Sequence, residues 1–492
     1  LDKYILSLDI GTSNIRCFIY DKEAKIKGRS SCRIEILYPE PQAVEIDPDR
    51  LWKQIVGAIK ESISSASIEP DSIASMGIST QRGTFMLWDK KTGKPFHNFL
   101  VWQVVKIHSI CSTLQRSTMA TLIFQLFYIL VFVSMRLLWL FDKYPDLRQL
   151  AKDGKVRFGT IDTWLVWKLT NGKVYTSEYS NASSTGIYDP FILDWSGFFC
   201  SLLSIPKVIF PPIMDTYDDY GKCDEEIFGF EIPIRCVVGD QQAAMFGQCC
   251  FEPGDVKLTL GTGAFLDLNV GEKPHASVAG FYPVVGWKIG NKITHLAEGS
   301  SNTAGDAVDW MLGMNFIKQP SQSEEIANLT DSSEGVYFVP GFNGIQAPIN
   351  DYLACGSLIG ITQNTKPEHV VRAVLESLAF RNKQVFDSMT TETSLQIKKF
   401  VCDGGVSANK IVMQLTTDLI GREISRQDQS EMSALGAAYF AGLAVGYWES
   451  LKQLKKLGVL KETFIPMQKR QKKYIPIMKQ WCKATKRSLN WY

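Results

Sequence analysis

The segment D-I-G-T-S-N-I-R at residues 9–16 combines residue types that can bind phosphate groups. Gly11 permits a tight turn that brings backbone N–H groups close to a ligand. Three short hydrogen-bond donors follow it: Thr12, Ser13 and Asn14. Arg16 adds a permanent positive charge, and the Asp9 carboxylate could hold Mg²⁺ directly or through water. The segment predicts a phosphate-binding hairpin tip, and a plain tight turn is the structural alternative.

A second Gly-Thr turn occurs in L-G-T-G-A-F at residues 260–265. It stands at the tip of an expected hairpin, as the first Gly-Thr turn does. This echo favours two phosphate-facing hairpins over two unrelated turns.

The segment V-V-G-D-Q-Q-A-A-M-F-G at 237–247 places an acid between an apolar strand pattern and a helical start. A carboxylate in that position can accept a proton, so Asp240 is the candidate general base. The structural alternative is that Asp240 caps the N-terminus of the helix.

The segment V-C-D-G-G-V-S-A-N at 401–409 is another turn from a strand pattern to a helical one. Its paired glycines permit close approach of the backbone to a ligand. Asn409 could then contact a base or a ribose, and helix capping explains the same residue equally well.

These segments need a scaffold of strands and helices to hold them. The first hundred residues predict a hairpin over 4–21, a helix after Asp47-Pro48, a strand at 72–80 and a hairpin over 84–102. The helix has apolar residues at four-residue intervals: Leu51, Ile55, Ile59 and Ile63. Strands and helices that alternate in this way indicate an α/β domain.

The same order of patterns begins again past the middle of the chain. A hairpin is predicted over 255–271, followed by helices at 368–388, 406–420 and 433–446. Two α/β halves that each open with a Gly-Thr hairpin indicate a duplicated fold. The junction is expected at about 244–256.

Length and composition agree with two large globular domains. The chain has 492 residues, and its net charge of +2 comes from 53 basic and 51 acidic side chains. This even balance predicts no nucleic-acid partner. The 11 cysteines contain no C-x-x-C, and the five histidines show no zinc-site spacing. The visible N-terminal segment runs directly into a strand pattern and does not resemble a signal peptide, so this cysteine usage predicts a cytoplasmic protein.

Taken together, the motifs resemble the FGGY carbohydrate kinases, and within that family the glycerol kinases and their divergent animal paralogues. The resemblance covers practically the whole chain. It is carried by LDIGTSNIR (8–16), ISTQR (78–82), VWQ (101–103), FGTIDTWLVWKLTNG (158–172), YSNASSTG (179–186), GDQQAAMFGQ (239–248), LGTGAF (260–265), GVYFVPGFNGIQAP (335–348), VVRAVLESLAF (370–380), DGGVSAN (403–409) and ALGAAYFAGLAVGYW (434–448).

The resemblance implies two RNase H-like domains of the actin–hexokinase type, with the active site in the cleft between them. We place an N-terminal, polyol-side domain at 1–248 and a C-terminal, nucleotide-binding domain at 249–492. The implied reaction is transfer of a phosphoryl group from ATP, with Mg²⁺, to a small polyol. Family members often self-associate, so a homo-oligomer is compatible with the resemblance.

The resemblance also assigns roles to individual residues. Asp240 is implied as the general base and, with Asp9, as a metal ligand. The residues implied for ATP are Thr12, Ser13, Asn14, Arg16, Thr262, Gly305, Gly405 and Asn409. The residues implied for the polyol are Arg82, Trp102, Asp240, Gln241 and Phe265.

Three positions depart from the glycerol kinase pattern. The family has a glutamate that binds a polyol hydroxyl where this chain has Gly83. It has a tyrosine where an ungapped count back from Trp139 places Val131. Asp309 stands where the family has a glutamine near the nucleotide. Two hydroxyl-binding groups of the family are thus absent. Phosphoryl transfer is therefore better supported than glycerol as the acceptor.

Three functions therefore compete. The leading hypothesis is ATP-dependent phosphorylation of glycerol to glycerol 3-phosphate. The second is the same chemistry on another polyol or sugar. The third is a nucleotide-binding regulatory protein without turnover.

Residues 117–135 form a run of nineteen residues without a formal charge, long enough for a transmembrane helix. The run lies inside the first α/β domain, so a span there would split one sheet and one active site. Gln125 near its centre also argues against a span. We expect a buried or cleft-lining segment, and a gene-model error over 104–136 is the alternative.

Overall fold

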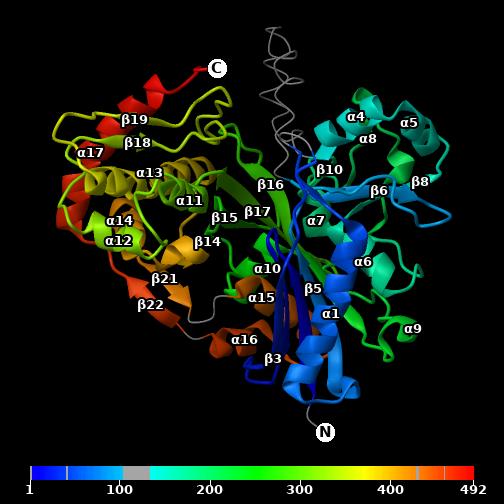
Figure 1. Cartoon of the computed structure of the whole chain (residues 1–492). Helices are drawn as coiled ribbons and strands as arrows, with labels where there is room; N and C mark the ends of the chain where they lie inside the picture. The colour runs from blue at the N-terminus through cyan, green and yellow to red at the C-terminus, as the bar shows by residue number, and fades with distance from the viewer. Residues whose placement is uncertain (1–2, 40–42, 103–132, 428–430, 459) are drawn as a thin grey trace.

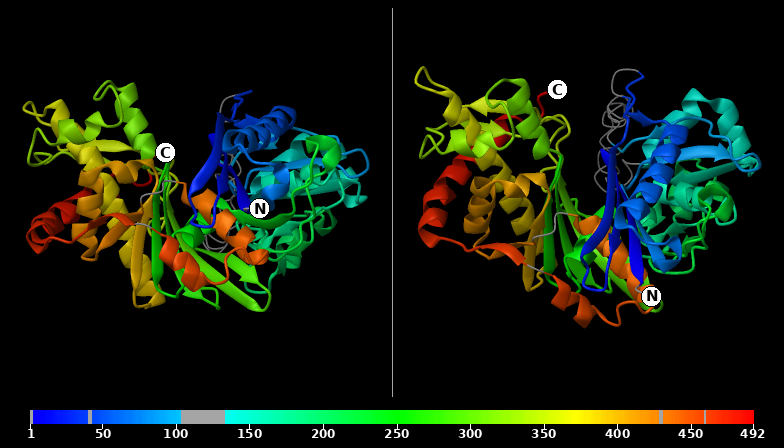
Figure 2. Two further views of the ribbon diagram at one scale, coloured as in Figure 1. Left: turned by 90° about the horizontal axis from the view of Figure 1, so that it is seen from below. Right: turned by 60° about the horizontal axis from the view of Figure 1, so that its bottom comes forward.

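Two large β-sheets with their packed helices form the two halves of the chain in the computed structural model (Figure 1). The structure describes residues 3–39, 43–102, 133–427, 431–458 and 460–492. The views in Figure 2 show the halves as two lobes. They meet at the helices labelled α10 (Asp240–Gly247) and α15 (Met432–Ala444) near the centre of Figure 1.

The first sheet has the strand order β13-β5-β1-β2-β3. Its strands are β1 (Tyr4–Ile10), β2 (Asn14–Tyr20), β3 (Ile26–Arg33), β5 (Ile73–Thr80) and β13 (Ile234–Gly239). Strand β2 pairs antiparallel with both β1 and β3, whereas β5 is parallel to β1 and β13 is parallel to β5. The predicted hairpin over 4–21 and the strand at 72–80 are confirmed, and β2 ends one residue before the predicted bound.

Helix α1 (Pro48–Ala66) packs on β2 and β3, and its sequence explains where it begins. The Asp47 carboxylate accepts a hydrogen bond from the backbone N–H of Arg50, and Pro48 opens the first turn. The apolar residues that predicted this helix are all buried: Leu51, Ile55, Ile59 and Ile63.

Helix α15 (Met432–Ala444), from far along the chain, covers the other face of the first sheet. The Ser7 hydroxyl donates to the carbonyl of Ala434 at 2.6 Å, and the Ser75 hydroxyl donates to that of Ala441 at 3.0 Å. A Cβ at Gly77 would lie 2.2 Å from the Ala437 carbonyl oxygen, so this contact requires glycine. Because helices cover both faces, β1 and β5 are buried almost along their whole length.

The second sheet has the order β16-β17-β15-β14-β20-β21-β22. Its strands are β14 (Asp255–Leu260), β15 (Ala264–Gly271), β16 (Tyr282–Ile289), β17 (Lys292–Ser301), β20 (Lys399–Asp403), β21 (Ile424–Gln427) and β22 (Leu460–Phe464). The helices of this half include α11 (Gly305–Gly313), α12 (Gln322–Ala327), α13 (Pro367–Thr393), α14 (Lys410–Ile420), α16 (Leu451–Leu457) and α17 (Gln468–Arg487).

The two sheets repeat one arrangement. In each, three adjacent antiparallel strands (β1-β2-β3, and β14-β15-β17) are extended by two parallel strands, β5 and β13 or β20 and β21. This confirms the predicted α/β class and the duplicated order of elements. One boundary differs from the prediction, because 406–420 is split into a 3₁₀ turn, η4 (Gly405–Ala408), and α14.

A smaller lobe is attached to the first half beside a four-stranded sheet of order β4-β7-β6-β8. Its strands are β4 (Glu45–Ile46), β6 (Phe85–Asp89), β7 (Phe99–Leu100) and β8 (Val156–Thr160), and β6 pairs with β7 as the predicted hairpin over 84–102 requires. The remaining helices are α4 (Val133–Lys143), α5 (Pro145–Lys152), α6 (Ile161–Leu169), α7 (Tyr179–Ser183), α8 (Gly197–Leu202), α9 (Glu225–Phe228) and α10 (Asp240–Gly247), with the 3₁₀ turns η1 (Pro70–Ser72) and η3 (Lys207–Ile209). Within the described residues there are also three short strand pairs: β9 (Ser177–Glu178) with β12 (Ile213–Met214), β10 (Tyr188–Asp189) with β11 (Asp194–Trp195), and β18 (Tyr337–Val339) with β19 (Ser357–Ile359).

The prediction for 117–135 falls almost entirely outside the described residues, as does Val131. Among the helices that the structure does describe, none combines the length and apolar character that a membrane crossing needs.

Candidate active site

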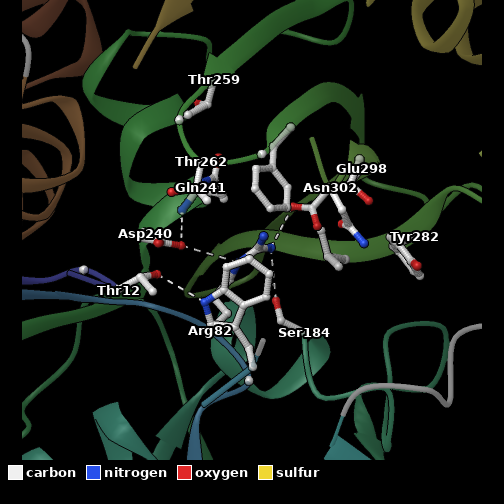
Figure 3. A pocket seen from close by; sticks show the side chains of 18 of the residues that line it. Thr12, Arg82, Ser184, Asp240, Gln241, Thr259, Thr262, Tyr282, Glu298 and Asn302 are labelled. Carbon is white, nitrogen blue, oxygen red and sulfur yellow. Dashed lines mark hydrogen bonds and ion pairs between the residues drawn. The ribbon is translucent and has the colours of Figure 1, made fainter. Parts of the chain in front are cut away.

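A cavity of about 360 Å³ is lined by residues from both halves of the chain. This volume suits a small molecule. In Figure 3, Asp240, Gln241 and Thr262 lie on one side of the cavity, and Tyr282, Glu298 and Asn302 lie on the other. Both Gly-Thr turns reach it, through Thr12 in the first half and Thr262 in the second.

The first hairpin tip lies between β1 and β2. Its residues line the cavity as a group: Gly11, Thr12, Ser13, Asn14 and Arg16. The backbone N–H of Gly11 donates to the carbonyl of Asn14 at 3.0 Å, which closes the turn. The indole N–H of Trp102 donates to the Thr12 hydroxyl at 3.1 Å, so the tip is tied to the loop after β7.

Asp9 lies behind this tip and is buried. Its Oδ2 is 3.7 Å from Nη1 of Arg16, which also pairs with Glu431 at 3.2 Å. Burial raises the pKa of Asp9 to about 7, against the opposing effect of its neighbours Ser79 and Arg16. Within the described residues its Oδ1 has no hydrogen-bond partner. A buried carboxylate oxygen left in this way has the chemistry of a ligand for a hard cation.

Asp240 is the first residue of α10, directly after β13. Its Oδ1 accepts a hydrogen bond from the backbone N–H of Gln241 at 2.8 Å and lies 3.5 Å from Nε of Arg82. The N-cap residue of α10 is Gly239, so the alternative of Asp240 as the cap residue is wrong. Burial raises the pKa of Asp240, while the positive charges of Arg82 and Lys257 act in the opposite direction.

Arg82, in the loop after β5, is held by three groups. Its Nη1 is 2.7 Å from the Glu298 carboxylate and 3.3 Å from the Ser184 hydroxyl, and its Nε faces Asp240. Burial disfavours the charged guanidinium, but the carboxylates of Glu298 and Asp240 outweigh that effect and raise the pKa of Arg82. The guanidinium is therefore a fixed cation at the wall of the cavity.

Two aromatic rings, one from each half, meet edge to face in the cavity. The rings of Trp102 and Phe265 have centroids 6.5 Å apart and are inclined by 72°, and both line the cavity. They add an apolar surface to a site that is otherwise rich in hydrogen-bonding groups.

The second hairpin tip lies between β14 and β15 and is supported by the start of α11. The backbone N–H of Gly305 donates to the Gly261 carbonyl at 2.9 Å, and a Cβ at Gly305 would lie 2.7 Å from that oxygen. Gly305 is thus required for close packing against the tip.

The turn after β20 holds the other two residues implied for ATP. Gly405 opens η4, and a Cβ there would meet nothing within 4 Å. Asn409 caps α14, because its Oδ1 accepts from the backbone N–H groups of Ile411 and Val412 at 3.0 and 3.1 Å. Its side-chain NH₂ donates to the Ser323 hydroxyl at 3.2 Å.

Most of the predicted site residues meet in one cavity. Those that line it are Thr12, Ser13, Asn14, Arg16, Arg82, Trp102, Asp240, Gln241, Thr262 and Phe265. Those that do not line it are Asp9, Gly305, Gly405 and Asn409.

The glutamate expected from the resemblance is replaced by Gly83, which lines the cavity with φ at +71°. A Cβ at this position would lie 3.6 Å from Nη2 of Arg136. Arg136 is buried and donates to the carbonyls of Gly83 at 2.7 Å and Leu100 at 3.0 Å. Burial lowers the pKa of Arg136 to about 9.

Sequence reasoning missed several polar groups around the site. Glu298 on β17 is the partner of Arg82, and Lys257 on β14 forms an ion pair with Asp267 on β15 at 3.0 Å. A signal for the second pair was present, because charged residues interrupt both apolar strands at equal distances from Thr262. The hairpin register indeed places Lys257 opposite Asp267.

Two family models match most of the chain. The N-terminal domain of the FGGY family of carbohydrate kinases matches residues 4–247, and the C-terminal domain of that family matches residues 256–445.

Individual relatives cover the whole chain. A protein named glycerol kinase 5 from Danio rerio is 47% identical over 518 residues, which cover 100% of this chain and 97% of the relative. A protein named glycerol kinase 2 from Thermotoga maritima is 39% identical over 493 residues, with 99% of both chains covered.

A solved structure has the same fold. The crystal structure of Plasmodium falciparum glycerol kinase with ADP superposes with a TM-score of 0.88 at 32% identity, covering 99% of this chain and 98% of that chain. This likeness confirms the expected two-domain architecture of the actin–hexokinase type.

Proposed function

Because the chain belongs to the FGGY family of carbohydrate kinases, we propose that it transfers a phosphoryl group from ATP to a hydroxyl of a small polyol, with glycerol as the leading acceptor. One observation carries this proposal. The Asp240 carboxylate and the Arg82 guanidinium face each other in a cavity that both Gly-Thr hairpin tips also line. A base, a fixed cation and two phosphate-binding turns are thus within one small volume.

In the proposed reaction, Asp240 removes the proton from the acceptor hydroxyl. The acceptor oxygen forms a bond to the terminal phosphorus of ATP as the bond from that phosphorus to the bridging oxygen breaks, and ADP leaves. Burial raises the pKa of Asp240, which makes its carboxylate a better base than an exposed aspartate. Arg82 and Gln241 orient the acceptor, and Trp102 and Phe265 pack on its carbon atoms.

The nucleotide is proposed to lie between the two hairpin tips. In the first half, Thr12, Ser13, Asn14 and Arg16 would bind its phosphates. In the second half, Thr262, Gly305, Gly405 and Asn409 would contact it. The open space at Gly405 supports this placement, while the capping role of Asn409 occupies its carbonyl oxygen and limits that residue to donation.

Asp9 and Asp240 would hold Mg²⁺. The Oδ1 of Asp9, which has no hydrogen-bond partner among the described residues, supports this assignment. When bound, Mg²⁺ would neutralise part of the phosphate charge that builds up during transfer. Most of the catalysis would then come from positioning and from charge neutralisation.

One observation favours a different acceptor within the same chemistry. Gly83 cannot accept a hydrogen bond through a side chain, although it lines the cavity beside Trp102. A site that has lost one hydroxyl contact discriminates less strongly for the original acceptor. Another polyol or sugar is therefore the second candidate substrate.

We also propose that the protein works in the cytoplasm, where ATP is abundant.

Release of ADP, measured over a panel of polyols and sugars, tests the proposal. We expect turnover with glycerol that falls by about 10²–10⁴-fold in Asp240→Asn, the range for loss of a general base. The control is Asp387→Asn, a half-exposed carboxylate on α13 that pairs with Lys383. Turnover with another acceptor alone would correct the substrate, and nucleotide binding without any turnover would overturn the enzymatic function.

A further inference from the structure

A buried ion pair lies directly behind Gln241 and belongs to the opposite half of the chain. Nζ of Lys257 on β14 is 3.0 Å from the Asp267 carboxylate on β15, and both side chains are fully buried. Lys257 also donates to the amide oxygen of Gln241 at 2.6 Å and to the Thr259 hydroxyl at 2.8 Å. The ammonium thus makes two hydrogen bonds and one ion pair.

This arrangement determines which end of the Gln241 amide is available to a ligand. An ammonium group can only donate hydrogen bonds, so the atom facing Lys257 must be the amide oxygen. Among the described residues, the amide nitrogen of Gln241 makes no hydrogen bond, and Gln241 lines the cavity. The Gln241 NH₂ group is therefore the part left for a ligand.

We propose that Lys257 and Asp267 are positioning residues, which fix the Gln241 amide so that its NH₂ donates to an oxygen of the acceptor. This inference rests on the proposed function. Asp240 then accepts the proton of the acceptor hydroxyl, while the neighbouring Gln241 NH₂ donates a hydrogen bond. Adjacent residues of α10 thus serve opposite hydrogen-bonding roles. A ligand that fits this pair carries hydroxyl groups, each of which can donate and accept.

The charge of Lys257 is secure in this position. Burial disfavours the ammonium, but the carboxylates of Asp267 and Asp403 outweigh that effect and raise the pKa of Lys257. Because Lys257 lies on β14 and Gln241 on α10, the contact also couples the acceptor site to the packing of one half on the other.

The test removes the whole pair, since a single substitution would leave one charge buried without its partner. In Lys257→Met/Asp267→Leu, Gln241 loses its anchor and keeps its own side chain. We expect the KM for the acceptor to rise by about three- to tenfold with little change in kcat, as for a lost ground-state hydrogen bond. The matched control is Arg372→Met/Glu376→Leu, which removes a buried ion pair on α13 and should leave the KM unchanged.

A double-mutant cycle separates positioning from general damage. In a Gln241→Ala background, removal of the Lys257–Asp267 pair should raise the KM by less than about twofold, because the group that it positions is already absent. An equal increase in both backgrounds would overturn the inference.

A crystal structure of Lys257→Met/Asp267→Leu tests the inference without catalysis. We expect the Gln241 side chain to adopt another rotamer or several. An unchanged Gln241 side chain would overturn the inference even if the enzyme is active. A wild-type protein without turnover on any acceptor would instead overturn the proposed function, and the structure would still decide the role of the pair.

Discussion

The guanidinium of Arg82 lies 2.7 Å from the carboxylate of Glu298, and this ion pair joins the loop after β5 to strand β17 of the other half. Both side chains are largely buried and both line the cavity. The orientation of Arg82 therefore depends on how the two halves pack, and Glu298 is the residue that transmits this dependence.

Substitution of Glu298 by glutamine should weaken acceptor binding. The variant keeps the shape of the side chain and removes the charge that holds Arg82. We expect acceptor binding to weaken by about 1.5 kcal/mol, which raises the KM for the acceptor about tenfold. The measurement is KM and kcat over the acceptor panel. The control is Glu462→Gln, which breaks the 3.0 Å ion pair between Arg426 on β21 and Glu462 on β22. Equal KM values in Glu298→Gln and wild type would show that Arg82 keeps its position without this partner.

Restoring the family's glutamate at position 83 tests whether Gly83 altered the acceptor. Gly83→Glu and Gly83→Ala share the strain of a side chain at φ +71°, at a cost of about 1 kcal/mol in unfolding free energy. Only Gly83→Glu adds a carboxylate, close to the guanidinium of Arg136. We expect the KM for glycerol to be about tenfold lower in Gly83→Glu than in Gly83→Ala. Equal KM values in the two variants would show that the acceptor is selected elsewhere.

The local parts of this fold could be predicted from the sequence because short-range patterns specify them. Helix α1 is specified by Asp47-Pro48 at its start and by apolar residues at four-residue intervals. The two hairpins are specified by strand patterns on both sides of a Gly-Thr turn. The boundary of α14 was missed because Asn409 interrupts a continuous helical pattern as its cap. The division of the chain at 248–249 stays a prediction.

Contacts between distant segments could not be predicted in this way. No local pattern shows that α15 covers the sheet formed by β1 and β5, because the contact depends on a glycine, Gly77, that precedes the helix by more than 300 residues. The same limit applied to Glu298, whose strand gives no sign of its partner. Lys257 and Asp267 differ, since the symmetry of their hairpin predicts that they pair.

Thr12 should connect the phosphate and acceptor sides of the cavity, because its hydroxyl accepts the indole N–H of Trp102 at 3.1 Å. Thr12→Val removes that hydroxyl with little change in shape. We expect the KM values for ATP and for the acceptor to rise together, by about three- to tenfold each. Thr12→Ser keeps the hydroxyl and should stay near wild type. A rise in the KM for ATP alone would show that Trp102 does not depend on Thr12.

Glu178, at the start of α7, should make stability depend on pH. Its carboxylate accepts from the backbone N–H groups of Ser180 and Asn181 and from the hydroxyls of Ser180 and Thr216. Burial outweighs these contacts and raises the pKa of Glu178 from 4.5 to about 8. Burial and the charge of this carboxylate also raise the pKa values of two neighbouring groups, Tyr220 and Cys236.

The sign follows from proton binding. Between pH 4.5 and about 8 the folded chain keeps the Glu178 proton that the unfolded chain has lost, so the free energy of unfolding falls as pH rises through this window. In this window Glu178 lowers the free energy of unfolding by up to about 1.4 kcal/mol per pH unit. The glutamine in Glu178→Gln resembles the protonated acid but does not titrate, so it adds no pH dependence to the free energy of unfolding. Denaturant unfolding at several pH values should therefore give a flatter dependence for Glu178→Gln than for wild type, and parallel curves would contradict a raised pKa at this residue.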